Sequence, residues 1–213
     1  MKFIASTVKL DEVPAAEEFL SPREMTLYSA LRFEKRRRDW LGGRFAAKRA
    51  ANAFAGAADC EVLNRPSRQP YLAKGGEELP LFLSITHSGD FAAAAVSGFP
   101  VGMDLETVAE RPQSWRNEFF SAEEARTSGA LALTELWARK EAVLKLLGIG
   151  LTTDLKKLTF DGSRPRLEGE ALAAWRKLNS IAIDTVSRKS PPGYITAVAF
   201  DAVNGGTPNG RFD

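Results

Sequence analysis

Two acidic residues at the end of an apolar run are the first in this sequence whose types and spacing suggest chemistry. Asp104 and Glu106 stand two positions apart in the segment VGMDLE. On a β-strand, residues two apart project from the same face, so the two carboxylates would lie side by side while Met103 and Leu105 enter the core. An isolated Asp-x-Glu is more often a polar strand face paired with Lys or Arg than a functional site.

A third carboxylate comes from the segment ELWARKEAVLKLLGIGL, which is typical of a helix. Glu141 and Lys145 lie four apart and share one face, with Lys140 beside them and Trp137 one turn before Glu141. An exposed ion pair is the alternative interpretation, worth about 0.3 to 0.5 kcal/mol. This polar stripe, however, borders an apolar face instead of lying opposite to it.

Brought together, the carboxylates of Asp104, Glu106 and Glu141 would form a site with oxygen ligands only. Such a site suits Mg²⁺, or Mn²⁺, and Mg²⁺ commonly shares its ligand shell with substrate phosphates. The single histidine of the chain, His87, excludes metal sites that need several histidines.

His87 has a different possible role, in the segment SITHSGDF where a predicted strand gives way to a glycine turn. A lone histidine at a strand end is usually structural. Thr86, His87 and Ser88 nevertheless offer hydroxyls, an imidazole and backbone N–H groups, which together could bind a phosphate. Arg44 and Lys48, four apart on a predicted helix, could add positive charge.

The elements that must position these groups occur twice along the chain. FLSPRE and FFSAEE each place Ser three residues before Glu, a capping box that predicts helix starts at Ser21 and Ser121. Each is followed by a helical stretch, in the first half with apolar spacing at Trp40, Leu41, Phe45, Ala47, Ala51 and Phe54. The N-terminal segment MKFIASTVKLDEVP is expected to form the first strand. After the helical stretches, strands are predicted in the segments CEVL, LFLSITHS and FAAAAVSG of the first half and LKKLTF, SIAIDTV and YITAVAF of the second.

This repetition predicts an α+β fold of two similar halves related by a pseudo-twofold, each a long helix on a small, mostly antiparallel sheet. The break at GFPVG sets the halves at residues 1–100 and 101–213, the second of which would carry the metal site. The active site is expected at the junction of the halves, since ligand clefts usually form there.

Composition narrows the classes of function. The chain has 213 residues, 44% hydrophobic and 26% charged, with a net charge of +2, which does not suit a general nucleic-acid binder. The run Arg36 to Arg38 is more typical of a solvated helix end than of a nucleic-acid-binding site.

The sequence also bears on where the protein is located. No membrane span or signal sequence is predicted, and the lone Cys60 suits a reducing compartment. A cytoplasmic location is therefore expected.

Four segments, in this order, give the chain a resemblance to a known family: THS at 86–88, GMDLE at 102–106, FFSAEE at 119–124 and WARKEAVLK at 137–145. It resembles the 4′-phosphopantetheinyl transferases of the two-half, surfactin-synthetase-activating type. The resemblance implies transfer of the phosphopantetheine arm of coenzyme A to a serine of an acyl or peptidyl carrier protein, with release of 3′,5′-ADP.

The resemblance also implies roles. Asp104, Glu106 and Glu141 would hold the metal, while Lys145, and Lys140 with it, would stabilise or protonate the leaving phosphate. The base for the carrier serine would be Glu141 or a metal-bound water, with Glu124 as a further candidate. Residues expected to bind coenzyme A are Arg44, Lys48, Arg68, Thr86, His87, Ser88 and Lys140.

This sequence departs from the family pattern at Gln69, where a cation is common, which is why the 3′-phosphate is assigned to Arg68. The expected partners are coenzyme A and a carrier protein, with no nucleic acid and no membrane, and the expected state is a monomer. The alternative function is a non-catalytic coenzyme A or nucleotide-binding module of the same fold.

Overall fold

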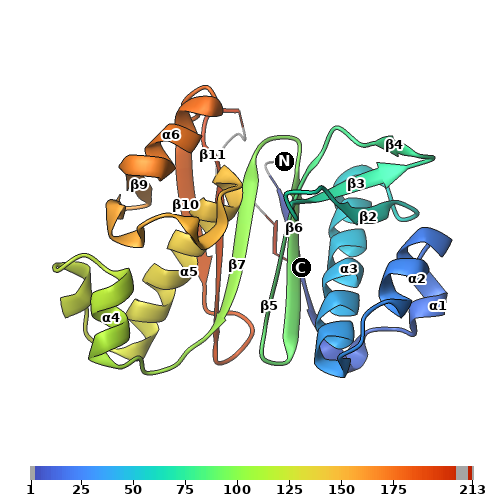
Figure 1. The fold of residues 1–213 in the computed structure, drawn as a ribbon, viewed down its shortest axis with the longest axis horizontal. Coiled ribbons are helices and arrows are strands. Elements are labelled where there is room, and N and C mark those ends of the chain that lie inside the picture. The colour runs from blue at the N-terminus through green and yellow to red at the C-terminus, as the bar shows by residue number, and fades with distance from the viewer. Residues whose placement is uncertain (1–2, 205–210, 213) are drawn as a thin grey trace. The chain divides into compact units, whose positions relative to one another are not determined.

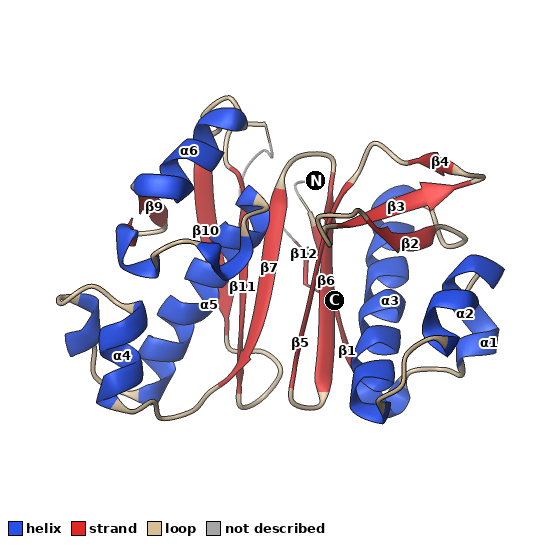
Figure 2. Ribbon diagram, viewed as in Figure 1, coloured by secondary structure: helices blue, strands red, loops and turns tan. Residues whose placement is uncertain are grey.

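The structure, a computed structural model, describes residues 3–204 and 211–212. It divides into two compact units: unit 1 comprises residues 1–101 and 205–213, and unit 2 comprises residues 102–204. The expected halves differ from these units at the C-terminus, because β12 (Arg211–Phe212) pairs in parallel with β1 (Ile4–Lys9) of unit 1. Helices and small antiparallel sheets occur in both units, which confirms the α+β class (Figure 2).

Unit 1 is built on a sheet with the strand order β12-β1-β6-β5, in which β5 (Phe82–Ser88) and β6 (Phe91–Ser97) form an antiparallel hairpin. The long helix α3 (Glu34–Ala55) packs along this sheet (Figure 1). The remaining elements of unit 1 are α1 (Ala16–Phe19), α2 (Pro22–Ser29), β2 (Glu61–Asn64), β3 (Pro70–Lys74) and β4 (Glu77–Glu78).

The face of α3 that packs on the sheet is made of small residues, not of the larger apolar residues that the spacing had suggested. A Cβ on Gly42 would lie 2.2 Å from Cδ2 of Leu10, and one on Gly43 would lie 2.8 Å from Cγ2 of Ile85. The helix backbone therefore approaches the strands closely. The fully buried alanines of this face are Ala46, Ala47, Ala50 and Ala51, whereas Trp40, Leu41, Phe45 and Phe54 are only half-buried.

Unit 2 repeats the plan with a sheet of order β10-β11-β7 and a long helix, α5 (Ala130–Leu147), packed on it. The strands are β7 (Val101–Thr107), β10 (Ile183–Arg188) and β11 (Tyr194–Asp201). The other elements are α4 (Gln113–Phe119), the hairpin β8 (Leu158–Asp161) and β9 (Arg164–Leu167), and α6 (Gly169–Lys177). Within the described residues, no helix is both long and apolar enough to cross a bilayer.

One of the two predicted helix starts is confirmed and the other is wrong. Ser21 caps α2, with its hydroxyl accepting from the backbone N–H of Glu24. The second capping box forms the same reciprocal bonds between Ser121 and Glu124, but only a single 3₁₀ turn, η2 (Glu124–Arg126), follows it. The long helix α5 starts nine residues later, after Gly129, because Thr127, Ser128 and Gly129 interrupt the helical conformation.

Candidate active site

Strand β7 places the two acidic residues as its alternation predicts. Met103 is 0% exposed and Leu105 is 1% exposed, so both belong to the core. Asp104 and Glu106 lie on the other face, where Asp104 is itself buried and Glu106 is half-buried. A buried carboxylate needs a counter-charge or hydrogen-bond donors, since desolvation disfavours its ionised form.

Helix α5 comes close enough to supply these groups because position 102 is a glycine. A Cβ on Gly102 would lie 1.9 Å from the carbonyl oxygen of Ala142 and 2.4 Å from the backbone nitrogen of Leu146. The backbones of β7 and α5 therefore touch at this point. The adjoining turns of α5 are thereby brought within side-chain reach of Asp104 and Glu106.

Three residues of α5, each one turn apart, face the strand. Nζ of Lys145 lies 2.6 Å from Oδ1 of Asp104 and forms an ion pair with it. The indole N–H of Trp137 donates to Oε1 of Glu106 at 3.0 Å. Glu141 lies between them in the sequence, is buried, and its Oε1 has no hydrogen-bond partner among the described residues.

Burial and the charges of neighbouring carboxylates raise the pKa values of Glu106 and Glu141. Burial, and after it the charges of Asp104 and Glu106, raise the pKa of Glu141 to about 7, although Lys145 opposes the shift. The pKa of Glu106 is also raised, first by burial and then by Asp104, and the Trp137 hydrogen bond and Arg111 act against this. A cation placed among these groups would lower the free energy of all three ionised carboxylates.

The oxygen ligands of Asp104, Glu106 and Glu141 are of the kind that a hard divalent metal ion prefers, but the three side chains are not arranged as a metal site. The described residues contain no group of three or more His, Cys, Asp or Glu side chains that could hold a metal ion in its present arrangement. The unsatisfied Oε1 of Glu141 and the pKa values of Glu106 and Glu141, raised first by burial and then by Asp104, are the observations that suit such an ion. Binding would require these side chains to rotate toward one another.

Arg111 is a residue of this site that the sequence reasoning missed. Its Nη2 lies 3.7 Å from Oε2 of Glu106, and its guanidinium stacks on the ring of Trp115. Trp115 in turn packs against Trp137, with ring centroids 4.8 Å apart. Glu106 is thus held at one oxygen by Trp137 and approached at the other by Arg111. No local pattern marks Arg111, because its contacts come from the packing of α4 against α5.

Lys140 and Glu124 lie away from the carboxylate set and bind each other. Nζ of Lys140 is fully buried, 2.7 Å from Oε2 of Glu124 and 2.9 Å from the carbonyl oxygen of Leu155. The same oxygen of Glu124 accepts from the backbone of Ser121. Burial lowers the pKa of Lys140. The pair connects η2 and the loop before β8 to helix α5, a structural position for both residues.

Unit 1 holds a cavity of about 410 Å³ between α3 and β5, and two of the predicted ligand-binding residues line it together. Arg44 lines the cavity from α3, and His87 lines it from β5. The Arg44 guanidinium lies 3.9 Å from the ring centre of Trp40, donates to Oδ1 of Asn64 at 2.6 Å, and leaves a buried Nε without a partner. Burial lowers the pKa of Arg44 to about 10.

The neighbours of His87 do not join it in this cavity. Strand alternation places Thr86 on the opposite face of β5, where it is buried. Ser88 follows the same alternation and is half-buried. The expected cluster of Thr86, His87 and Ser88 is therefore divided between two faces of one strand, and His87 alone of the three lines the cavity.

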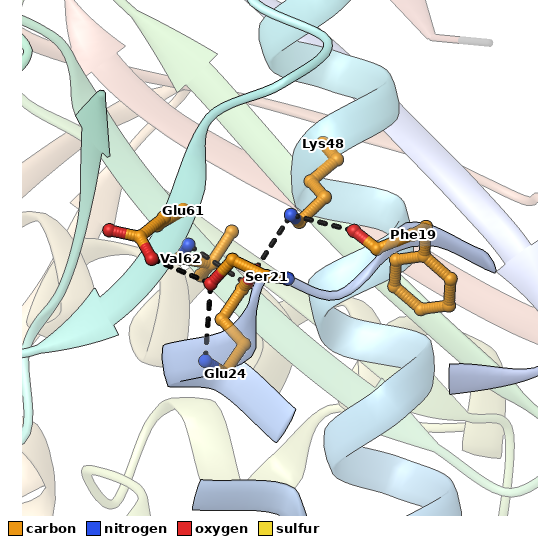
Figure 3. A network of polar contacts seen from close by, with 6 residues as sticks. All are labelled: Phe19, Ser21, Glu24, Lys48, Glu61 and Val62. Atoms are coloured by element: carbon orange, nitrogen blue, oxygen red, sulfur yellow. Dashed lines mark hydrogen bonds and ion pairs between the residues drawn. The ribbon is translucent and has the colours of Figure 1, made fainter. Parts of the chain in front are cut away.

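Lys48 is occupied by an internal network that Figure 3 shows. Its Nζ lies 2.7 Å from Oε2 of the fully buried Glu24 and 2.9 Å from the carbonyl oxygen of Phe19. Glu24 also accepts from the backbone N–H groups of Ser21 and Val62. The lysine thus fastens α2 to α3 and to β2, and it does not line the cavity that contains Arg44.

Arg68 lies in an exposed turn and has a positive φ of 69°. Its carbonyl oxygen accepts from Nδ2 of Asn64, whose Oδ1 binds Arg44. The turn is therefore linked to Arg44 through one amide side chain. The Arg68 side chain itself is outside the residues that line the cavity.

Unit 2 contains a larger cavity, of about 660 Å³, whose walls are mostly apolar. It lies among β9, α6 and the start of β10, with Trp175 and Leu172 in its lining. Arg164 is its one charged lining residue. This lining offers no group for acid–base or metal chemistry.

Comparison with known proteins was consistent across both units. The family model for the 4′-phosphopantetheinyl transferase superfamily matches residues 100–199, and the model for the 4′-phosphopantetheinyl transferase N-terminal domain matches residues 25–97. The two models thus cover both β7 with α5 and the α3 region.

Individual relatives match over parts of the chain. A 4′-phosphopantetheinyl transferase, gsp, of Aneurinibacillus migulanus is 27% identical over 113 residues, which is 47% of this chain and 48% of the relative. The holo-[acyl-carrier-protein] synthase of Enterococcus faecalis is 34% identical over 87 residues, or 38% of this chain and 74% of the relative. The chain thus spans about half the length of the first of these relatives.

Among solved structures, the holo-[acyl-carrier-protein] synthase of Helicobacter pylori, crystallised in complex with coenzyme A, is 21% identical with a TM-score of 0.36. That match covers 45% of this chain and 97% of the other.

Proposed function

The chain belongs to the 4′-phosphopantetheinyl transferase superfamily, and from this premise we propose that it transfers the 4′-phosphopantetheine arm of coenzyme A to a serine of an apo acyl or peptidyl carrier protein. In this reaction the serine oxygen forms a bond to the phosphorus next to the pantetheine. The phosphoanhydride bond at that phosphorus breaks, 3′,5′-ADP leaves, and the serine proton passes to a base.

The packing of α5 on β7 is the observation that carries the proposal. It joins Lys145 to Asp104 at 2.6 Å and Trp137 to Glu106 at 3.0 Å. It also buries Glu141 with an oxygen that lacks a hydrogen-bond partner among the described residues. Positive charge beside the phosphate oxygens and carboxylates that can bind a metal ion both favour phosphate transfer, and Lys145 lies here beside such carboxylates.

Asp104, Glu106 and Glu141 are the residues that would hold Mg²⁺, or Mn²⁺. The ion would supply charge stabilisation to the diphosphate. The side chain of Lys145 is 28% exposed, so its ammonium group can leave Asp104 and bind a phosphate oxygen of the leaving 3′,5′-ADP. Glu141 is the favoured base because it lies beside Asp104 and Glu106, whose charges help to raise its pKa, whereas Glu124 is paired with the buried ammonium group of Lys140.

The cavity of unit 1 is the proposed site for a phosphate group of coenzyme A. Arg44 is preorganised there by the face of Trp40 and by Asn64, and its Nε has a hydrogen to donate. His87, Lys35 and Arg36 add further donors to the same lining. Lys48, Lys140 and Thr86 have buried structural positions and are not assigned a ligand contact.

The second candidate, a coenzyme A-binding module without catalysis, is favoured by one observation, namely that the carboxylates are not arranged as a metal site. The experiment that separates the two is the intact mass of a panel of apo carrier proteins after incubation with this protein, coenzyme A and Mg²⁺. A gain equal to one phosphopantetheine arm, lost on addition of a chelator, is the expected result.

The matched control is the Asp104→Asn variant, which keeps the shape of the side chain and removes its charge. It should bind coenzyme A in calorimetry and modify carriers at least about 100-fold more slowly than wild type. No mass gain on any carrier with the wild-type protein, combined with normal coenzyme A binding, would favour the non-catalytic module. The responding carriers would identify the physiological partner class.

A further inference from the structure

The cavity of about 660 Å³ in unit 2 has the size of a small-molecule site, and none of its lining residues has a role in the proposed transfer reaction. It is formed by three elements that follow one another in the chain, β9, α6 and β10, together with the first residues after β11 (Figure 1). Sites for small organic ligands usually measure roughly 300 to 1,000 Å³. The chemistry of the walls therefore decides which ligand this cavity accepts.

The apolar walls arise from local periodicity in these elements. Pro165 and Leu167 are two apart on β9 and so share one face of that strand. Leu172 and Trp175 are three apart on α6 and share one face of the helix, and Ile181 continues the wall after the turn. All five side chains are only half-buried. An apolar molecule bound here would remove their surface from water, which favours binding.

Three hydrogen-bond donors of the walls are already satisfied within the protein. The indole N–H of Trp175 donates to the carbonyl oxygen of Ile181 at 2.7 Å. The backbone N–H of Ser180 donates to the carbonyl oxygen of Trp175 at 3.2 Å, and that of Ala202 donates to the carbonyl oxygen of Ala182 at 2.6 Å. These donors need no partner from a ligand, so an apolar body suits the walls.

The one charged residue of the lining is an arginine without an ionic partner. Arg164 lies at the start of β9 and is exposed, and its guanidinium forms no hydrogen bond or ion pair with the described residues. Asp161, which lies opposite Arg164 in the β8–β9 hairpin, is paired with Arg166 instead, at 2.8 Å. No acidic residue is among the described residues that line the cavity. The cavity thus combines apolar walls with one available positive charge.

We propose that this cavity binds a small amphipathic anion, with the apolar body of the ligand against Leu172 and Trp175 and its anionic head group at Arg164. Charge complementarity selects an anion over a neutral or cationic molecule with the same apolar body. The guanidinium group can bind a carboxylate through two parallel hydrogen bonds. Burial of the apolar body supplies most of the affinity, and the arginine supplies the preference for the head group.

Calorimetry with decanoate, a carboxylate on a linear alkyl chain, tests the site in the full chain at low ionic strength and below the critical micelle concentration. Affinity should fall about fourfold for each methylene removed, in nonanoate and then octanoate, because each shorter chain buries less apolar surface. Decyltrimethylammonium, which has a chain of the same length and the opposite charge, should bind more weakly than decanoate. A wild-type protein that does not bind decanoate would overturn the proposal.

Arg164→Glu tests the head-group contact by reversing its charge. The variant should bind decyltrimethylammonium more tightly than decanoate, the reverse of the wild-type preference. Arg166→Glu is the matched control, because Arg166 is exposed on the same strand and lies outside the lining. It should keep the preference for decanoate. An unchanged preference in Arg164→Glu would remove Arg164 from the site and refute the choice of an anion.

Ala182→Trp tests where the ligand binds. Ala182 is exposed and lines the cavity, so an indole at this position should occupy the cavity without disturbing the core and should abolish decanoate binding. Ala173→Trp is the matched control, at an exposed position of α6 outside the lining, and should bind decanoate as wild type does. Full binding by a folded Ala182→Trp variant, established by circular dichroism, would place the ligand elsewhere and contradict the proposal.

Two other occupants would give different results. Decanol binding as tightly as decanoate would assign the cavity to neutral apolar molecules. A wild-type dimer in sedimentation equilibrium that becomes a monomer in Ala182→Trp, with no binding of decanoate, would assign this surface to a second copy of the chain. Either result would overturn the anion site. The carrier-modification assay is independent of these outcomes, since no residue of the α5–β7 site lines this cavity.

Discussion

The ammonium group of Lys145 lies 2.6 Å from Oδ1 of Asp104 and joins the long helix of unit 2 to the strand that carries the acidic pair. Both residues belong to segments that the sequence places about forty positions apart. In this arrangement the lysine neutralises a carboxylate that Glu106 and Glu141 would otherwise repel. Asp104 is also one of the residues proposed to hold a metal ion, so the same carboxylate would be shared between that ion and Lys145.

Asp104→Asn should lower kcat/KM for carrier modification by at least about 100-fold, the usual size of effect when a group that stabilises transition-state charge is removed. The measurement is the initial rate of mass gain on the most responsive carrier. The far-ultraviolet circular dichroism spectrum should stay that of wild type. A rate within a few-fold of wild type would remove Asp104 from the proposed site.

Gly102→Ala should destabilise the protein strongly, because the new methyl group would meet the backbone of α5 at Ala142 and Leu146. Overpacking against a side chain typically costs about 1 to 3 kcal/mol in the free energy of unfolding, and backbone atoms yield less readily. Urea unfolding measures the effect. Gly98→Ala is the control, because its Cβ would meet nothing within 4 Å, and its unfolding free energy should be nearly unchanged.

Glu141→Gln should make the stability of the metal-free protein less dependent on pH. The pKa of Glu141 is raised to about 7 in the folded state, so the folded protein retains a proton there that the unfolded chain has lost. The contribution of Glu141 to wild-type stability therefore falls as pH rises from about 4.5 to 7. The variant avoids this loss and should be more stable than wild type at pH 7.5, by on the order of 1 to 3 kcal/mol.

Urea unfolding in the presence of a chelator, at several pH values, tests this expectation. The unfolding free energies of Glu141→Gln and wild type should approach each other near pH 4.5. A constant difference across the range would show that Glu141 titrates normally. Such a result would contradict the burial and charge repulsion described for this site.

Arg111→Ala should weaken transfer by about tenfold, because Oε2 of Glu106 loses its cationic neighbour and Trp115 loses a stacking partner. The effect should appear in the Mg²⁺ concentration needed for half-maximal rate. It should also appear in the change of tryptophan fluorescence when Mg²⁺ is added without coenzyme A. Arg126→Ala, at an exposed position in η2, should leave both quantities unchanged.

Lys48→Met should destabilise unit 1, by about 3 to 5 kcal/mol, since it leaves the fully buried carboxylate of Glu24 without its cation. The double variant Lys48→Met, Glu24→Gln should recover part of that loss. Coenzyme A affinity, measured where the variants are folded, should stay close to wild type. A large and specific loss of affinity would instead return Lys48 to the ligand site.

The sequence by itself determined the features that follow from local periodicity. Alternation along β7 separates Asp104 and Glu106 from the core residues Met103 and Leu105, and both core residues are buried as predicted. Helical spacing sets Glu141 and Lys145 on one face of α5. The first capping box likewise starts α2 at Ser21. These outcomes depend on neighbours within a turn or a few residues, so the residue pattern is sufficient to predict them.

Tertiary structure decided which of the chemically capable side chains are available to a ligand. Lys48 and Lys140 have the same charge as Lys145, yet each is a buried lysine paired with a glutamate from another segment. Arg111 reaches Glu106 only because α4 packs against α5. Long-range packing sets the partner, the burial and hence the charge state of each group, and no spacing within a single helix or strand carries that information.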